Sequence, residues 1–513
     1  MNGMTQAVER VRRAIRDGEM VAVYGDFDAD GVCSTALLTQ ALKTLGAKAM
    51  PYIPHRINEG YGLNEDALKE LKNDKGVRVV ITVDCGIRSL AEVDKGTALG
   101  LDMIVTDHHS VGETLPRAVA VINPKQVGDA YPFQEFAGVG IAFKLAQALS
   151  IAQNESPMPN AQTLDMDELV DLVALGTVAD LVPLIGENRT LVKRGLMRLN
   201  KTERPGLQAM MQQAGAKNRA MNAGTIGFFL GPRLNAAGRI EHARTAYRLL
   251  TTQYPGEAEN LAALLETTNR ERQKLTEEMT QKARAMVAAM PQGEYILIAG
   301  SPEFPEGIIG LIASKMQEDA YRPAIAMTHK DGVMRGSARS IPEFSLIAAL
   351  DECADLLVRH GGHAAAAGFT VENKNFDALH ARLREIAARE LSRLELTPTI
   401  SIDAEASLTD MNWKLLEHLD QLAPFGYGNR EPVFLSRNVI VKAARVVGTD
   451  HLALTVSDGV VVWDAIAFRQ KDALSQLAPL PKQVDVVYNL SSKVWGGEAR
   501  LQLEVKDLRI SDL

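Results

Sequence analysis

Short apolar segments alternate with amphipathic helical segments through the first 110 residues, and this alternation restricts the fold more than any other feature. Residues 21–24 (VAVY), 77–84 (VRVVITVD) and 102–107 (DMIVTD) have the composition of buried strands. Helical spacing covers residues 4–17 and 34–47. Because strands that alternate with helices usually form a parallel, doubly wound sheet, we predict an α/β fold for this region.

The chain then changes character twice. Residues 254–290 form a long polar helical pattern, which is typical of a solvated helix that bridges two domains. A second α/β pattern follows to about residue 395, and several short strands with turn signals then suggest a small barrel of the OB type. A chain of 513 residues is too long for one ordinary domain. We expect domains over residues 1–250, 293–396 and 397–513, with the connecting helix over residues 251–292.

Composition excludes several classes of protein. The three cysteines, Cys33, Cys85 and Cys353, form no CxxC pair, so neither a disulfide framework nor a thiolate zinc site is expected. The N-terminal segment has no apolar signal core, and no apolar run is long enough to span a membrane. These features predict a cytoplasmic enzyme. The net charge of −8 argues against a chain that coats nucleic acid, but it allows a local basic groove.

Acidic residues follow each of the three predicted strands. Asp84 follows the second strand, and the first and third are followed by two larger sets: Asp26, Asp28 and Asp30, and Asp107, His108 and His109. Ligands of an open parallel sheet collect outside the carboxyl ends of its strands, so we expect these side chains to converge. The first three acids alternate, and in extended backbone they would point the same way, with Gly31 allowing a tight turn after them.

Carboxylates and imidazoles without thiolates favour Mn²⁺ or Mg²⁺ over structural zinc. Acids crowded into one crevice repel each other, and divalent cations remove that repulsion. A single aspartate after a strand is more often a helix cap or a turn residue, but three acidic strand ends together favour a metal site. Asp180 ends an apolar helical run over residues 168–184. It is either a further ligand, which we prefer, or a solvent-exposed helix end.

Four segments resemble the motifs of the DHH phosphoesterases: GDFDADG (25–31), VDCG (83–86), TDHHS (106–110) and ALGTVADLVPL (174–184). A fifth segment, GGHAAAAGF (361–369), resembles the GGHxxAAG signature of the DHH-associated domain, although alone it could also be a tight turn into a helix. Three more segments narrow the resemblance to the RecJ family: PHRINEGYGL (54–63), GPRLNAAGRI (231–240) and GSARS (336–340). With the strand-rich tail, the resemblance covers nearly the whole chain.

The resemblance implies a fold and an activity. The fold is an α/β parallel-sheet DHH domain, joined by a long helix to a smaller α/β DHH-associated domain and followed by an OB-fold β-barrel. The activity is hydrolysis of single-stranded DNA from its 5′ end to 5′-mononucleotides, in DNA recombination and repair, with two divalent ions, Mn²⁺ or Mg²⁺. Single-stranded DNA is the implied partner, with a helicase or a single-strand-binding protein as a further one, and the chain is expected to be a monomer.

The resemblance also implies roles for individual residues. It makes metal ligands of Asp28, Asp30, Asp84, His108 and Asp180, with Asp84 bridging two ions. It places three further residues in the catalytic site: Asp26, His109 and His363. It assigns the 5′-terminal phosphate to Arg56, Ser337 and Arg339, and further DNA contacts to Arg233 and Asn235. Nucleobases could stack on Tyr61, Phe425, Tyr427 or Trp463, each of which could equally be a packing residue.

Two other functions compete with this interpretation. A DHH enzyme that acts as a phosphodiesterase or phosphatase on short oligoribonucleotides would share the motifs, but such enzymes usually lack the long tail. A catalytically inactive, RecJ-related replication scaffold would have lost ligands, whereas every expected ligand position here holds Asp or His. A pyrophosphatase would share the metal site but not this length. The first motif starts 25 residues from Met1, closer than is usual in RecJ proteins, and the tail ends soon after the predicted barrel.

Overall fold

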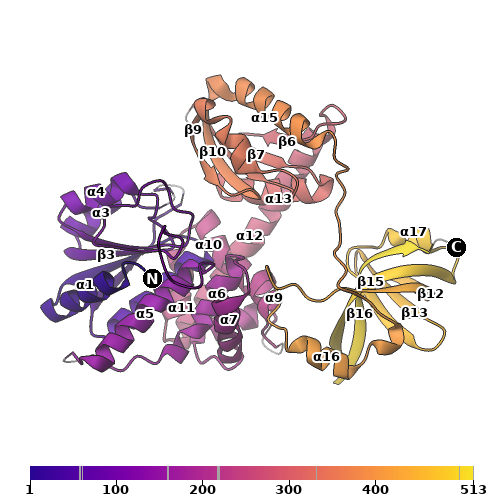
Figure 1. Cartoon of the computed structure of the whole chain (residues 1–513), viewed down its shortest axis with the longest axis horizontal. Helices are drawn as coiled ribbons and strands as arrows, with labels where there is room; N and C mark the ends of the chain where they lie inside the picture. The colour runs from indigo at the N-terminus through magenta and orange to yellow at the C-terminus, as the bar shows by residue number, and fades with distance from the viewer. Residues whose placement is uncertain are drawn as a thin grey trace. The chain divides into compact units, whose positions relative to one another are not determined.

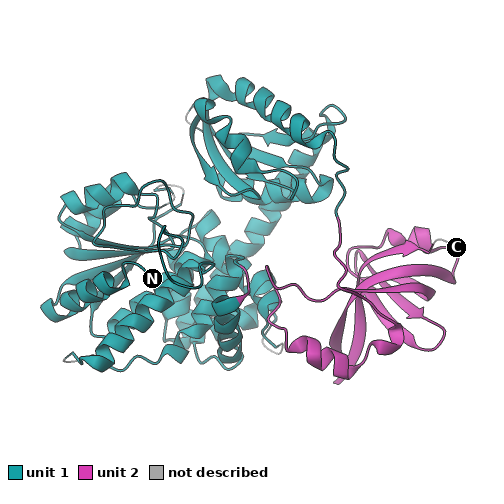
Figure 2. Cartoon of the chain, in the orientation of Figure 1, with its two compact units in different colours: residues 1–182, 186–398 teal, residues 183–185, 399–513 magenta. Residues whose placement is uncertain are grey.

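The computed structural model describes residues 1–56, 59–60, 62–158, 161–216, 220–330, 332–495 and 497–511. The chain divides into two compact units: unit 1 contains residues 1–182 and 186–398, and unit 2 contains residues 183–185 and 399–513 (Figure 2). The predicted sequence of a parallel α/β domain, a long helix, a smaller α/β domain and a barrel is confirmed. The finer domain boundaries stay predictions. In the described part of the chain, no helix is long and apolar enough to cross a membrane.

Unit 1 begins with a five-stranded parallel sheet in the order β2-β1-β3-β4-β5. Its strands are β1 (Met20–Gly25), β2 (Lys48–Tyr52), β3 (Val77–Val83), β4 (Asp102–Thr106) and β5 (Ala120–Ile122). The sequence predicted β1, β3 and β4 but missed β2 and β5. Figure 1 shows α3 (Glu65–Asn73) and α4 (Leu90–Ala98) on one side of the sheet, and α1 (Met4–Asp17) and α5 (Gly138–Glu155) on the other. The chain order reverses between β1 and β3, the position where doubly wound sheets bind ligands.

The three predicted strands end level with one another. Gly25 of β1 pairs with Val83 of β3, and Val83 in turn pairs with Thr106 of β4. All but one residue of β3 is buried, as expected for a strand covered by helices on both faces. The residues that follow the three strands therefore emerge side by side at one edge of the sheet.

Helices then carry the chain from this sheet to the next domain. They are α6 (Val170–Ala179), α7 (Gly186–Leu199), α8 (Pro205–Gln213), α9 (Ala223–Thr225), the π-helical turn η2 (Ile226–Leu230), α10 (Gly231–Ile240) and α11 (Arg244–Thr251). The predicted long helix is α12 (Pro255–Ala288), whose 34 residues correspond to a length of about 50 Å. It packs against α8 and α10 along its first part and against α13 (Ile309–Ala320) near its end.

A second, mixed sheet completes unit 1, in the order β6-β7-β8-β10-β9. Its strands are β6 (Leu297–Gly300), β7 (Ala324–Lys330), β8 (Val333–Arg339), β9 (Leu357–Gly362) and β10 (Ala366–Glu372). Only the β6–β7 pair is parallel. Helix α13 packs against β7 and β8, and α14 (Leu346–Asp351) and α15 (Phe376–Leu391) complete the domain.

Unit 2 contains a closed barrel. Its strands are β12 (Phe434–Val447), β13 (His451–Ser457), β14 (Val462–Ala467), β15 (Lys482–Trp495) and β16 (Glu498–Ile510). Strand β12 pairs with both β13 and β15, which closes the sheet, and β14 runs parallel to β16. Alternate residues such as Val441, Leu454 and Tyr488 fill the interior. This topology, with the short helix α17 (Ala473–Leu477) before β15, is that of an OB-fold.

Candidate metal and phosphate-binding site

The level strand ends bring carboxylates and imidazoles together. Three groups have ligand atoms within 4.8 Å of one another: Asp26, Asp28 and Asp84; Asp30, His108 and Asp180; and Asp84, His108 and His109. Asp84 and His108 each belong to two groups. The structure thus gathers all five predicted ligands, together with Asp26 and His109, although their individual roles stay predictions.

The backbone of the first motif differs from the expected extended one. Helix α2 (Ala29–Thr44) begins inside the motif, so the prediction of extended backbone with three parallel side chains is wrong. Asp28 caps this helix, and its Oδ1 accepts the backbone N–H groups of Asp30 and Gly31 at 2.9 and 3.0 Å. Aspartate favours this capping position, and the cap overrides the alternation. Asp30 lies in the first turn instead, where its carboxylate accepts the N–H groups of Gly138 and Val139.

The backbone at Asp84 is strained. Its φ angle is 62°, in the left-handed region that non-glycine residues seldom adopt and that recurs at functional sites. The neighbouring helices approach through glycines: a Cβ on Gly138 would lie 2.8 Å from Asp84 Oδ1, and one on Gly176 would lie 2.6 Å from Asp30 Oδ1. These two glycines therefore leave room for the carboxylates.

His108 has the features of a metal ligand. Its Nε2 lies 3.0 Å from Asp84 Oδ1 and 3.6 Å from Asp180 Oδ2. Both ring nitrogens are buried. Burial and the charge of His109 lower the pKa of His108 to about 3, so the ring is neutral near pH 7 and offers a lone pair to a cation.

The acids around His108 also fit a cation. Burial and the charge of Asp28 raise the pKa of Asp30 to about 7. Burial and a neighbouring aspartate likewise raise the pKa values of Asp26, Asp84 and Asp180. Buried carboxylates that repel one another, with imidazole and no thiolate, form a donor set suited to Mn²⁺ or Mg²⁺. The residues present therefore fit the predicted divalent ions.

His109 has the opposite charge state because of Asp107. Its Nδ1 lies 2.7 Å from Asp107 Oδ1, and this aspartate also accepts the N–H groups of Ile87 and His108. Burial alone would lower the pKa of His109, but the hydrogen bond with Asp107 and the nearby acids raise it to about 9. His109 is therefore positively charged near neutral pH. Asp107 was expected among the acids at the strand ends, but its hydrogen bond with His109 was not predicted, although its place directly before both histidines was the available signal.

Four arginines of unit 1 are close enough to influence one another electrostatically, and one of them is influenced by Asp28. These are Arg56, Arg239, Arg272 and Arg339, and we call them the arginine cluster. Burial and the charges of Arg56 and Arg272 lower the pKa of Arg239 to about 10; Arg339 adds to this effect, and the charge of Asp28 opposes it. The cluster therefore holds several positive charges within electrostatic range of one predicted metal ligand, Asp28.

Among the described residues, the close contacts of the arginine cluster are with neutral groups. The guanidinium of Arg56 lies 4.7 Å from the centre of the Phe27 ring, and Arg239 donates to the carbonyl of Gly307 at 3.1 Å. Arg272 donates to Asn269 Oδ1, and Arg339 donates to the carbonyl of Ala338 and to Ser337 Oγ. These are neutral partners. Such a group of cations is suited to an anion with several acceptor oxygens, such as a phosphate.

Arg239 and Arg272 were not predicted as site residues from the sequence. Arg239 is the last arginine of the GPRLNAAGRI segment, in which only Arg233 and Asn235 were selected. Those two have partners here: Arg233 pairs with Glu266 at 2.6 Å, and Asn235 Oδ1 accepts the N–H of Ala29 at 2.8 Å. Their predicted contacts with DNA stay predictions. Arg272 belongs to no motif, so only the fold of α12 could reveal it.

His363 lies in the turn between β9 and β10, so the GGHAAAAGF segment is a strand-turn-strand unit rather than a turn into a helix. Its side chain is exposed. Burial of part of the ring and the positive charge of His109 lower its pKa, which places His363 within electrostatic reach of the strand ends. Its role in the catalytic site stays a prediction.

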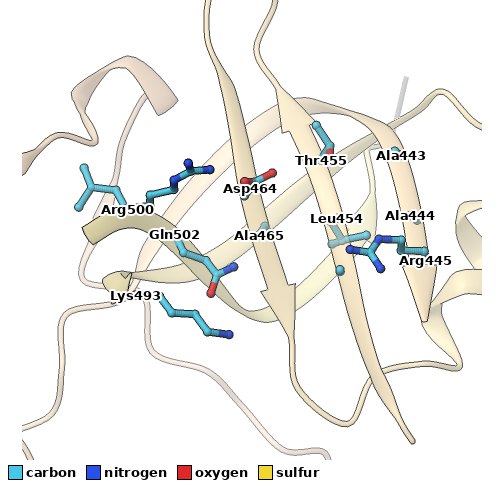
Figure 3. A pocket seen from close by; sticks show the side chains of 12 residues that line it. Ala443, Ala444, Arg445, Leu454, Thr455, Asp464, Ala465, Lys493, Arg500 and Gln502 are labelled. Carbon is cyan, nitrogen blue, oxygen red and sulfur yellow. The ribbon is translucent and has the colours of Figure 1, made fainter. Parts of the chain in front are cut away.

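Unit 2 carries a separate cavity of about 330 Å³ on the surface of its barrel (Figure 3). Arg445, Lys493 and Arg500 line it, with Asp464 as the acidic residue. Of the predicted stacking residues, Tyr427 is 66% exposed and Phe425 is half-buried, whereas the indole N–H of Trp463 donates to Leu408. Tyr61 lies outside the described residues.

Comparison with known proteins decides the family. Residues 20–177 match the DHH family N-terminal domain, residues 293–389 match the DHHA1 domain, and residues 402–507 match the RecJ OB domain. The chain is 35% identical over 524 residues to the single-stranded-DNA-specific exonuclease RecJ of Dickeya dadantii, covering 99% of this chain and 90% of that protein. The chain belongs to the RecJ family. Its members among these relatives are single-stranded-DNA-specific exonucleases.

Two further RecJ proteins extend the comparison. The chain is 39% identical over 516 residues to RecJ of Bacillus subtilis, covering 100% of this chain but only 64% of that longer protein. The crystal structure of RecJ from Thermus thermophilus in complex with Mn²⁺ superposes with a TM-score of 0.84 and 32% identity, covering 100% of this chain and 72% of that one. The RecJ fold therefore extends over the whole chain.

Proposed function

We propose that this chain is a metal-dependent exonuclease that removes 5′-mononucleotides from the 5′ end of single-stranded DNA. The observation that carries this proposal is the contact of the arginine cluster with the first acidic motif. Arg56 lies against the ring of Phe27, which stands between Asp26 and Asp28 in the chain, and Asp28 and the three other arginines all act electrostatically on Arg239. A phosphate held by the arginines would therefore be near the predicted metal ligands, as end-directed hydrolysis requires.

The side chains at the strand ends have complementary roles in this reaction. Two divalent cations, Mn²⁺ or Mg²⁺, held by Asp28, Asp30, Asp84, His108 and Asp180 would lower the pKa of bound water and neutralise the attacking and leaving oxygens. His109 remains charged through its hydrogen bond with Asp107 and is placed to donate to a phosphate oxygen. Asp26 is held by the N–H of Phe27, which fixes its carboxylate beside Asp28 and Asp84.

The charge of the arginine cluster favours a strand terminus over an internal phosphate. A terminal phosphate carries a charge of about −1.5 to −2 at pH 7, whereas an internal phosphodiester carries a single negative charge. Arg56, Arg339 and Ser337, the residues that the family resemblance assigns to the 5′-phosphate, belong to this region of unit 1. Arg239 and Arg272 add charge there, and Arg239 is within electrostatic range of Asp28.

The barrel would bind the strand away from its end. OB-folds bind single strands with backbone cations and a few stacking side chains. The cavity with Arg445, Lys493 and Arg500 offers cations from three strands, and Tyr427 offers an exposed ring elsewhere in unit 2. A helicase or single-strand-binding partner, a monomeric state, a cytoplasmic location and a role in recombination and repair remain parts of this proposal, supported by family membership alone.

One experiment tests the activity and its direction. The purified full chain is given Mn²⁺ and four DNA substrates: 5′-labelled linear single strand, 3′-labelled linear single strand, circular single strand and blunt duplex. We expect the 5′ label to appear at once as a mononucleotide and the 3′-labelled strand to shorten stepwise, while circle and duplex survive. Cleavage of the circle, or early release of the 3′ label, would refute the proposal.

Short oligoribonucleotides form a further arm of this experiment. Faster turnover of a trinucleotide RNA than of single-stranded DNA would assign the chain to the oligoribonucleotide phosphodiesterases instead. Binding of DNA without any hydrolysis in Mn²⁺ or Mg²⁺ would support the inactive scaffold. The Asp84→Ala chain serves as the control for contaminating nucleases.

A further inference from the structure

The main chain passes between the arginines of the cluster at two glycines. Gly307 lies in the short helix η3 (Glu306–Ile308), and its carbonyl accepts a hydrogen bond from Arg239. Gly310 is the second residue of α13, which follows directly. Glu306 holds this segment through a two-oxygen contact with Arg335 of β8, at 2.6 and 2.7 Å. The segment is therefore fixed in place, and at Gly307 and Gly310 it presents no side chain to the arginines.

The two glycines differ in what surrounds them. A Cβ on Gly307 would lie 2.1 Å from the carbonyl oxygen of Arg239, a backbone atom that cannot move away. A Cβ on Gly310 would lie 3.1 Å from Arg339 Nη2 and 3.1 Å from Ser337 Oγ. Both of these atoms are mobile ends of side chains, and both belong to the residues assigned to the terminal phosphate. Gly307 is thus required by the fold, whereas Gly310 can be changed.

We propose that Gly310 is a specificity-determining residue: because it carries no side chain, Ser337 Oγ and the Arg339 guanidinium keep the mutual position from which they would hold the 5′-terminal phosphate. This inference rests on the proposed recognition of that phosphate. A methyl group at position 310 would be accommodated by displacing the guanidinium and the hydroxyl, because these are the atoms free to move. The enzyme would keep its metal site but lose part of its preference for a phosphorylated end.

Gly310→Ala tests the proposal, and Gly256→Ala is its matched control. Gly256 is also the second residue of its helix, α12, and a Cβ there would meet nothing within 4 Å. Both substitutions bring the same gain in helix propensity, so neither should lower the thermal midpoint. The measurement is kcat/KM with Mn²⁺ on two single strands of one sequence, one with a 5′-phosphate and one with a 5′-hydroxyl.

We expect Gly310→Ala to lower the phosphate-to-hydroxyl ratio of kcat/KM about tenfold, the effect of weakening one charged hydrogen bond. Gly256→Ala should leave this ratio unchanged. The same glycine change in an Arg339→Ala background should add little, since the displaced group is then already absent. An unchanged ratio in Gly310→Ala, or effects that multiply in the double variant, would overturn the inference.

The wild-type arm separates this inference from the proposed function. A wild-type chain that degrades DNA from the 5′ end but treats both ends alike would overturn terminal phosphate recognition and this inference together. A wild-type chain with the preference, and a Gly310→Ala chain with the same preference, would overturn the inference alone. Marked thermal destabilisation of Gly310→Ala would also overturn it, because the methyl group would then displace the fold rather than two side-chain ends.

Discussion

Two adjacent histidines have different charge states because different groups surround their ring nitrogens. Both ring nitrogens of His108 are buried, and the burial disfavours its charged form, whereas Nδ1 of His109 is held by Asp107. One imidazole is thus available as a neutral ligand and the other as a cation. A single aspartate sets this difference, by accepting from one ring and from both backbone N–H groups.

Asp84→Asn should abolish hydrolysis and leave the fold intact. Asn tolerates the left-handed backbone at this position, but it removes the charge shared by two of the ligand groups. Substituting a residue that hydrogen-bonds to a metal ligand typically lowers activity about 10- to 100-fold. Loss of a ligand itself should therefore lower the rate by more than 100-fold. Mn²⁺-dependent rates on single-stranded DNA measure the effect. Asp102→Asn, at the opposite end of β4, is the control, and near-normal activity of Asp84→Asn would refute a bridging role.

The sequence predicted which residues meet but not how the backbone presents them. Acidic strand ends located Asp26, Asp84 and His108, because parallel strands end at one edge. The start of α2 at Ala29 was missed, since whether Asp28 extends a strand or caps a helix depends on the packing of the following helix. Arg272 was missed because a charge on a long polar helix gives no sign of what it faces.

At the scale of elements, helix α10 connects the first motif with the arginine cluster. Asn235 near its middle accepts the N–H of Ala29, directly after the predicted ligand Asp28. Arg239 near its end donates to the carbonyl of Gly307. The helix approaches the motif so closely that a Cβ on Gly238 would lie 2.1 Å from the carbonyl oxygen of Phe27. Its position therefore affects both ends of the site.

Asn235→Ala should weaken metal binding more than it weakens the fold. The change leaves the Ala29 N–H without its acceptor and frees the start of α2, which carries Asp28 and Asp30. We expect the Mn²⁺ concentration for half-maximal activity to rise about tenfold. Asn222→Ala removes a similar cap, from Thr225 of α9, and should leave the Mn²⁺ dependence unchanged. Equal Mn²⁺ dependence of the two variants would contradict the role given to Asn235.

Asp485 of β15 stabilises the closure of the barrel in a pH-dependent way. Burial alone would raise its pKa, but hydrogen bonds from the Asn438 N–H and Ser511, with the charges of Arg437 and Arg509, lower it. A lowered folded-state pKa contributes stability above the unfolded value near pH 4, and this contribution is lost as the pH falls through the folded value. Asp485→Asn should therefore lower the unfolding midpoint at pH 7, with a smaller difference from wild type below pH 4.

Tryptophan fluorescence can follow this effect in unit 2 alone. The chain has three tryptophans, Trp413, Trp463 and Trp495, and all of them follow residue 399. Denaturant titrations of the full-length wild type and of Asp485→Asn give the difference between their unfolding midpoints at pH 7 and near pH 3.5. The same loss of stability at both pH values would show that the charge of Asp485 does not stabilise the barrel.

At the scale of the whole molecule, unit 1 is expected to perform the chemistry and unit 2 to retain the strand. Arg445→Ala combined with Arg500→Ala removes two cations from the barrel cavity. Affinity for a 20-nucleotide strand should fall about 10- to 100-fold, and the salt dependence should become shallower. Turnover of a trinucleotide should stay unchanged, because so short a strand need not reach the barrel. Lys442→Ala, on the same strand as Arg445 but outside the cavity lining, is the control.

An equal loss on the long strand and on the trinucleotide would contradict this division of roles. It would mean that the barrel cations act on the reaction itself or on the fold of unit 2. The thermal midpoint and tryptophan fluorescence of the double variant distinguish these two causes.

Unit 2 is discontinuous in the chain, which limits how the protein can be cut. Residues 183–185 belong to it although they lie between α6 and α7, and the Leu184 N–H donates to the carbonyl of Tyr427. Leu184 is almost fully buried. A fragment that starts at residue 399 would lack residues 183–185. A protein truncated after residue 398 would leave Leu184 without the residues of unit 2 that bury it. The boundary of unit 2 is therefore not a single cut before residue 399, and a fragment that is to keep all the main chain of this unit must also carry residues 183–185.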